Sequence, residues 1–119
     1  MTIVAAIVVV LVALLHVYFM VLETALWDKP AGLKAFGQTK EQAGATKVLA
    51  ANQGLYNGFL AAGLLWGVIQ GAAGNDFKVF FLLCVIAAGI VGALTASRKI
   101  LYVQALPGLV GLILVMISA

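Results

Sequence analysis

The stretch TIVAAIVVVLVALLHVYFMVLETALW (residues 2–27) decides the fold class, because His16 and Glu23 are its only acidic or basic side chains. As an α-helix this run would be about 39 Å long, which exceeds the roughly 30 Å hydrocarbon core of a bilayer. We therefore expect a membrane-spanning helix that tilts or protrudes. The run lacks the positively charged start of a cleaved signal peptide and is too long for one, so we expect it to be retained.

Three more apolar segments follow, at residues 48–70, 77–97 and 101–118. We predict an all-α membrane protein whose residues 1–119 form one domain, a bundle of four transmembrane helices. The composition agrees, since 65% of the 119 residues are hydrophobic and 9% are charged, against about 25% charged in soluble domains. This excludes a water-soluble enzyme. The net charge of +3 comes from scattered residues, so we also expect no nucleic-acid partner.

Loop charges predict the orientation of the spans. The first and third loops carry six basic residues, namely Lys29, Lys34, Lys40, Lys47, Arg98 and Lys99, whereas the opposite side carries only Lys78. Basic loops remain in the cytoplasm. We therefore expect a multi-pass protein of the bacterial cytoplasmic (inner) membrane, with both termini on the non-cytoplasmic side.

Local signals predict helix ends in the first loop. Asp28 followed by Pro30 favours a helix start and Gly37 a stop, which predicts a short helix lying at the cytoplasmic interface. Thr39 and Gln42 have the spacing of a capping box, so the second long helix is expected to begin in water directly after Thr39.

The remaining connections are shorter. The sequence GAAG at residues 71–74 is expected to end the second span, and Asn75 or Asp76 to cap the third. Pro107 either kinks the fourth helix or lies in its first turn. A stripe of small residues in the third span packs either within the bundle or against another copy. Its members are Gly89, Gly92, Ala93 and Ala96.

Polar side chains within the spans are the candidate site residues, because a buried polar group in hydrocarbon is costly unless it is paired. Most of them are expected at one depth, in the cytoplasmic half, with His16 nearer the midplane. The set comprises His16 and Glu23 on the first helix, Asn52, Gln53, Tyr56 and Asn57 on the second, and Tyr102 and Gln104 on the fourth.

These residues have structural as well as functional interpretations. The four side chains of the second helix either hold helices together or orient a ligand. Glu23 either reaches the interface and pairs with Arg98 or Lys99, or it carries charge or a proton for a ligand. His16 is expected to be a hydrogen-bonded core residue or part of a proton relay. We expect no metal and no other cofactor, because no second His stands at ligand spacing and Cys84 is the single cysteine.

Several motifs together resemble a known family. They are Leu15-His16-x-Tyr18, Leu22-Glu23-x-x-x-Trp27, Phe36-Gly37, the stretch NQGLYNGFLA (residues 52–61) and Gln104-Ala-Leu-Pro107. This pattern, which covers nearly the whole chain, is similar to that of the small bacterial membrane proteins grouped as domain of unknown function 1304. The resemblance implies four spans and no established activity.

Our leading functional hypothesis is a protein that binds a small amphipathic or lipid-soluble molecule in an inward polar pocket, with membrane lipid around it. One alternative is an intramembrane isomerase-type enzyme in which Glu23 or His16 moves a proton. Others are an oligomeric proton-coupled transporter and a purely structural partner protein. No catalytic motif of known spacing is present, so catalytic residues are not assigned and the formation of homo-oligomers is left open.

Overall fold

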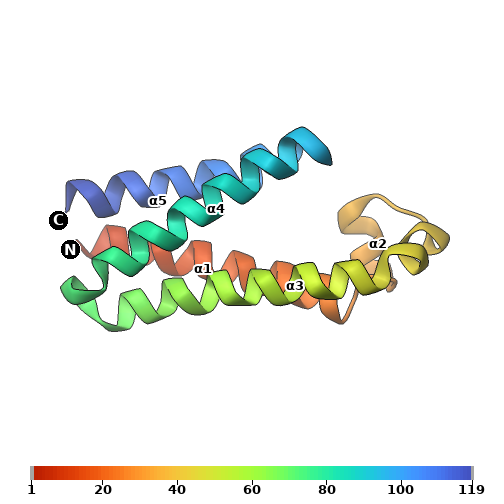
Figure 1. Ribbon diagram of the computed structural model, residues 1–119, viewed down its shortest axis with the longest axis horizontal. Helices are drawn as coiled ribbons and strands as arrows, with labels where there is room; N and C mark the ends of the chain where they lie inside the picture. The colour runs from red at the N-terminus through yellow and green to blue at the C-terminus, as the bar shows by residue number, and fades with distance from the viewer. Residues whose placement is uncertain (1, 119) are drawn as a thin grey trace. The chain divides into compact units, whose positions relative to one another are not determined.

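The computed structural model describes residues 2–118, which form helices and no strand. In chain order the elements are α1 (Ile3–Thr24), α2 (Pro30–Phe36), α3 (Lys40–Ile69), the 3₁₀ turn η1 (Gly71–Gly74), α4 (Asn75–Thr95), the π-helical turn η2 (Leu101–Ala105) and α5 (Leu106–Ile117) (Figure 1). The prediction of an all-helical chain is confirmed.

Within residues 2–118, two helical segments are long and apolar enough to cross a membrane. They are α1 and the segment Gly71–Thr95, while Leu101–Ile117 is a shorter apolar helix. These segments support association with a membrane. α3 covers the expected span at residues 48–70 except for Gln70, but it is not one of the two. Its apolar stretch is interrupted by Asn52, Gln53 and Asn57.

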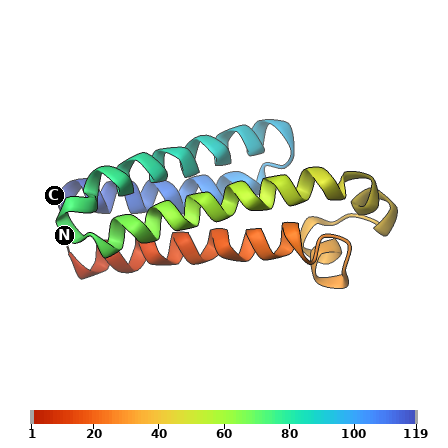
Figure 2. The same cartoon turned by 60° about the horizontal axis from the view of Figure 1, so that its bottom comes forward.

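The chain divides into two compact units. Unit 1 comprises Met1–Leu14 and Leu60–Ala119, and unit 2 comprises Leu15–Phe59. In unit 1, α4 and α5 lie side by side in both views (Figure 2). Leu82 and Val85 of α4 and Val115 of α5 are buried there.

Glycines bring the helices of unit 1 close together. A Cβ on Gly89 would lie 2.5 Å from the Ala105 backbone nitrogen, and one on Gly108 would lie 2.9 Å from a Val85 methyl carbon. Gly92 similarly faces the side chain of Ile100. Gly89 and Gly92 of the small-residue stripe therefore pack against residues of the same chain. At these two positions the stripe is not a surface for packing against another copy.

Pro107 lies in the first turn of α5 rather than at a kink in its middle. Proline has no N–H to donate to the carbonyl four residues earlier. The preceding turn η2 has wider hydrogen-bonded rings, in which the Leu106 N–H donates to the Leu101 carbonyl. This π-helical turn lets the chain continue into α5 past the proline.

In unit 2, the ends of α2 and the start of α3 follow the predicted signals. Pro30 begins α2, and Gly37 ends it in the left-handed conformation at φ 61°. The capping box forms in full, because the Gln42 N–H donates to Thr39 Oγ1 at 3.1 Å and the Thr39 N–H donates to Gln42 Oε1 at 2.9 Å. The predictions of a helix in the first loop and of a second long helix that begins after Thr39 are confirmed.

Two predicted helix ends are wrong. The first helix ends at Thr24 instead of Trp27, because the chain turns there and the Lys29 N–H donates to the Leu26 carbonyl at 3.0 Å. At the start of α4 the N-cap is Gly74, with no side-chain cap. The Asn75 side chain is not a cap, because its oxygen accepts a hydrogen bond from Lys78.

Candidate functional site

The candidate site is built around a buried hydrogen bond in unit 2. Asn57 Nδ2 on α3 donates to Glu23 Oε1 on α1. Both side chains are almost fully buried, with 8% of Glu23 and 6% of Asn57 exposed. An amide donor satisfies one acceptor position of a carboxylate that has been removed from water. Two of the predicted site residues are thus brought together.

Glycines on α3 make this hydrogen bond reachable. A Cβ on Gly54 would lie 2.6 Å from Thr24 Cγ2 and 3.1 Å from the Met20 carbonyl oxygen. A Cβ on Gly58 would lie 2.8 Å from the Met20 sulfur. Because both glycines lack a side chain, the backbone of α3 approaches α1 closely enough for the short Asn57 side chain to reach Glu23.

His16 lies two turns before Glu23 on α1 and is fully buried, with 0% exposed. Its ring meets the Phe19 ring edge to face, with centroids 5.4 Å apart and planes at 77°. The burial agrees with a core position, and among residues 2–118 no three His, Cys, Asp or Glu side chains group as metal ligands. Its role in a proton relay stays a prediction.

The other polar residues of α3 lie differently. Asn52, Gln53 and Tyr56 are exposed, Tyr56 by 58%. Asn57 is therefore the member of the predicted cluster that meets Glu23, while the other three form an exposed face of α3. We call this set, Asn52, Gln53 and Tyr56, the α3 polar face.

Tyr102 and Gln104 belong to unit 1. Both lie in the π-helical turn η2, where Tyr102 is exposed and Gln104 is buried. Residues two apart on a helix point to nearly opposite sides of it, which gives these two positions different surroundings. Their place in one layer with Glu23 stays a prediction.

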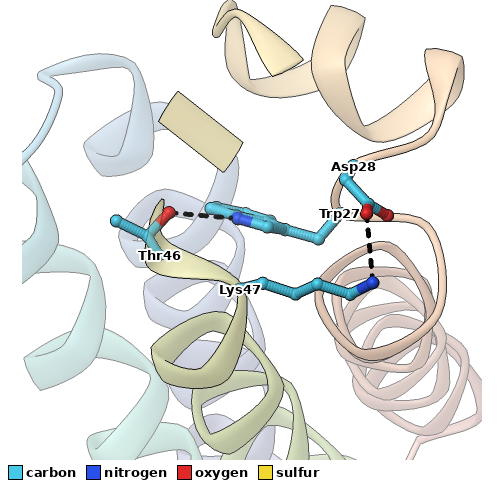
Figure 3. Close-up of polar contacts among 4 residues, drawn as sticks. All are labelled: Trp27, Asp28, Thr46 and Lys47. Atoms are coloured by element: carbon cyan, nitrogen blue, oxygen red, sulfur yellow. Dashed lines mark hydrogen bonds and ion pairs between the residues drawn. The ribbon is translucent and has the colours of Figure 1, made fainter. Parts of the chain in front are cut away.

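A pair of polar contacts beside α2 was missed by the sequence reasoning. Trp27 Nε1 donates to Thr46 Oγ1 at 3.1 Å, and Lys47 Nζ donates to Asp28 Oδ2 at 3.0 Å (Figure 3). The hydrogen bond from Lys47 lowers the pKa of Asp28 below its ordinary value. Two adjacent residues after α1 thus bind two adjacent residues of α3, and each pair is separated by 19 residues in the chain.

Lys78 was predicted to be a loop charge, and this is wrong. The side chain is fully buried in unit 1, and its ammonium donates to the Gly71 carbonyl at 2.9 Å and to Asn75 Oδ1 at 3.0 Å. The alkyl chain fits because Gly67 has no Cβ, which would lie 2.9 Å from Lys78 Cγ. The spacing of Asn75 and Lys78, three residues apart on one helix, was the available signal.

Comparisons with known proteins identify the family of the chain. The family model described as protein of unknown function DUF1304 matches residues 10–116. The chain is 33% identical over 106 residues to the uncharacterized protein YpaA of Lactococcus lactis subsp. lactis (strain IL1403), a match that covers 87% of this chain and 89% of that protein. No solved structure matches the chain. On the family match and this relative, the chain belongs to the DUF1304 family.

Proposed function

We propose that this chain is a four-span protein of the cytoplasmic membrane that binds a small amphipathic or lipid-soluble molecule at the α3 polar face, beside the Glu23–Asn57 pair. α1, the segment Gly71–Thr95 and the helix Leu101–Ile117 support three of the spans. The last of these is about 26 Å long, close to the thickness of the hydrocarbon core. The remaining span is the part of α3 that follows Lys47.

The basic residues support the orientation. Six of the seven lie between residues 29 and 47 or at residues 98 and 99, which supports a cytoplasmic position for these segments. Trp27 and Thr46 then mark the polar boundary of the membrane in unit 2. Asn52 follows Lys47 by five residues, about 8 Å along the helix, so the α3 polar face lies within the cytoplasmic half.

The observation that carries the proposal is the exposure of Asn52 and Gln53 next to a buried, hydrogen-bonded carboxylate. An amide left without hydrogen bonds in hydrocarbon costs roughly 2–7 kcal/mol. A ligand with a polar head would supply those hydrogen bonds, because each amide both donates and accepts. Its apolar part would lie on the exposed Leu55 and Phe59 of the same helix.

Within this arrangement Glu23 is the charge-bearing or proton-bearing group, and Asn57 holds it in place. The carboxylate accepts from Asn57 through Oε1. Gln53 lies one turn before Asn57 on α3, so its amide flanks the pair. The exposed amides would orient the ligand, and the buried pair would discriminate for or against a charged or hydroxyl-bearing head.

The test is the mass of small molecules that co-purify with the full chain in lipid nanodiscs. The wild type is expected to retain a defined molecule that is lost when Asn52→Leu and Gln53→Leu are combined. The control combines Leu83→Ala with Ile90→Ala on the exposed face of α4 and should retain the molecule. Identical small-molecule content in all three proteins, or none in the wild type, contradicts the proposal.

A further inference from the structure

The Glu23 carboxylate has one hydrogen bond and no ionic partner within residues 2–118. Asn57 Nδ2 donates to Oε1, and no other hydrogen bond reaches the carboxylate in that range. The ion pair that forms there joins Lys47 to Asp28 at 3.0 Å and does not involve Glu23. Acidic side chains within membrane spans are rare, and they pair with other groups or mark the path of a ligand. A ligand can therefore supply the partner that Glu23 lacks.

The second carboxylate oxygen of Glu23 is accessible. Within residues 2–118, the Gln38 amide nitrogen is the side-chain nitrogen or oxygen that is fully buried without a hydrogen bond. Glu23 Oε2 also lacks a hydrogen bond but is not fully buried, so it contributes to the 8% of Glu23 that is exposed. An ionised carboxylate accepts hydrogen bonds through both oxygens. Oε2 can therefore bind a donor that approaches from outside the chain.

The accessible side of the Glu23–Asn57 pair is the side of Gln53. At 100° per residue, Gln53 lies about 40° from Asn57 around the axis of α3, and Gly54 lies about 60° away in the opposite direction. The Gly54 side is covered, because a Cβ there would lie 2.6 Å from Thr24 Cγ2. The Gln53 side chain is exposed. A ligand head that reaches Glu23 therefore lies next to the Gln53 amide.

Aromatic rings adjoin this position. Tyr56 follows Gln53 by three residues, so their side chains are neighbours on the helix surface. The Tyr56 ring lies 6.2 Å from the Phe59 ring, and the two side chains are 58% and 55% exposed. α3 has no basic side chain after Lys47. Because aromatic ring faces and carboxylates both attract cations, these features together favour a positively charged head.

We propose that the ligand of the α3 polar face is an amphiphile with a primary amine head, and that its ammonium pairs with Glu23 Oε2. The inference rests on the proposed function and names the chemical class of its ligand. A primary ammonium has three N–H donors. One would bind Glu23 and a second the Gln53 amide oxygen, while the ammonium would also face the Tyr56 ring. An anionic head would be repelled by the carboxylate, and a hydroxyl head would lack the ionic attraction.

The experiment compares three probes that share one alkyl chain, using the full protein in phosphatidylcholine nanodiscs. Hexadecylamine, hexadecanol and hexadecanoic acid are added at equal mole fraction, the protein is extracted in mild detergent, and each retained probe is measured by mass. At neutral pH the amine is positively charged, as lysine is. We expect several-fold more amine than alcohol or acid, because only the amine forms an ion pair with Glu23. The net charge of +3 on the chain opposes nonspecific retention of a cation.

Two variants of equal charge separate a site from general attraction. Glu23→Gln removes the charge but keeps a carbonyl oxygen that accepts from Asn57, so the contact between α1 and α3 is retained. It should retain the amine and the alcohol equally. Glu41→Gln removes the same charge from an exposed acid in the first turn of α3 and should keep the preference. A preference for the amine that survives Glu23→Gln, or that is lost equally in Glu41→Gln, overturns the inference.

The wild-type result needs no variant of Glu23 and separates the inference from the proposed function. The alcohol or the acid could be retained at least as well as the amine and be lost when Asn52→Leu and Gln53→Leu are combined. That result contradicts the amine head and leaves the proposed function standing. Retention of all three probes only at the level of the combined variant contradicts both.

Discussion

Asn57 and Glu23 lie 34 residues apart in the chain, and the amide of the first donates a hydrogen bond to the buried carboxylate of the second. The bond depends on the backbone of α3 approaching α1 at Gly54, one turn before Asn57. A small residue and a polar residue on one helix face therefore act together. Alanine substitutions at Gly54 and at another glycine of α3 can separate the close approach of the helices from the general effect of replacing a helical glycine.

Gly54→Ala should destabilise the protein by roughly 1–3 kcal/mol, because the new methyl group would lie 2.6 Å from Thr24 Cγ2 and force the helices apart. Gly44→Ala is the control, since a Cβ there meets nothing within 4 Å. It should stabilise α3 by about 1 kcal/mol through helix propensity. Thermal unfolding in mild detergent measures both, and equal shifts for the two variants would contradict the close approach.

Asn57→Leu should lower the free energy of unfolding by roughly 1–3 kcal/mol, because it leaves the Glu23 carboxylate without its donor in a buried position. Asn52→Leu, at an exposed position, should have little effect in detergent. In a Glu23→Leu background the cost of Asn57→Leu should shrink. An undiminished cost in that background would show that the two side chains are not coupled.

The ion pair of Asp28 and Lys47 predicts a dependence on acidic pH. Its hydrogen bond holds the pKa of Asp28 below the ordinary 3.8, so the pair stabilises the folded chain above that pH. The stabilisation is lost as the pH falls through the lowered pKa of the folded state. The effect should be small and weaker in high salt, because the pair is exposed.

Thermal unfolding of Asp28→Asn in detergent, measured from neutral pH down to about pH 3, checks this dependence. The variant should be less stable than the wild type near neutral pH, and the difference should shrink as the pH falls. Glu41→Gln is the matched control at an acid with no recorded ion pair within residues 2–118. A difference for Asp28→Asn that grows on acidification would have the wrong sign.

Membrane orientation can be tested by labelling intact cells with an impermeant thiol reagent, in a Cys84→Ala background. Ala73→Cys, in η1, should react from outside, whereas Ala35→Cys, in α2, should react only after the membrane is opened. Both positions are exposed. The neighbouring Gly74 is unsuitable for a cysteine, because a Cβ there would lie 2.0 Å from the Gly67 carbonyl oxygen. The opposite labelling pattern would place the polar face in the other half of the membrane.

Much of the helical framework was predictable because its signals are local. Pro30, Gly37 and the capping box of Thr39 and Gln42 act over a few residues, and each ends or starts a helix as expected. The end of α1 was not predictable from composition, because Ala25, Leu26 and Trp27 are as apolar as the helix before them. At their turn Gly32 of α2 packs closely on the Leu26 carbonyl oxygen, and this tertiary contact cannot be read from composition.

The site was predictable only in part. A contact between Glu23 and the amides of α3 was predicted only from their similar expected depth in the membrane. The rotation of α3 depends on where Gly54 and Gly58 approach α1, which turns Asn57 inward and leaves Asn52 exposed. At 100° per residue, the four side chains from Asn52 to Asn57 span about 140° around the axis of α3, so they cannot all face one neighbouring helix. The contacts of Trp27 and Asp28 depend on helix register, which no local pattern encodes.

Photo-crosslinking from the α3 polar face tests the central claim most directly. Benzoylphenylalanine would replace Tyr56 in one protein and Phe80, an exposed aromatic of α4, in the other, with both proteins in their native membrane. We predict one defined small-molecule adduct at position 56, lost when Asn52→Leu and Gln53→Leu are added, and a mixture of bulk phospholipids at position 80. The same phospholipid mixture at both positions would contradict a binding site on α3.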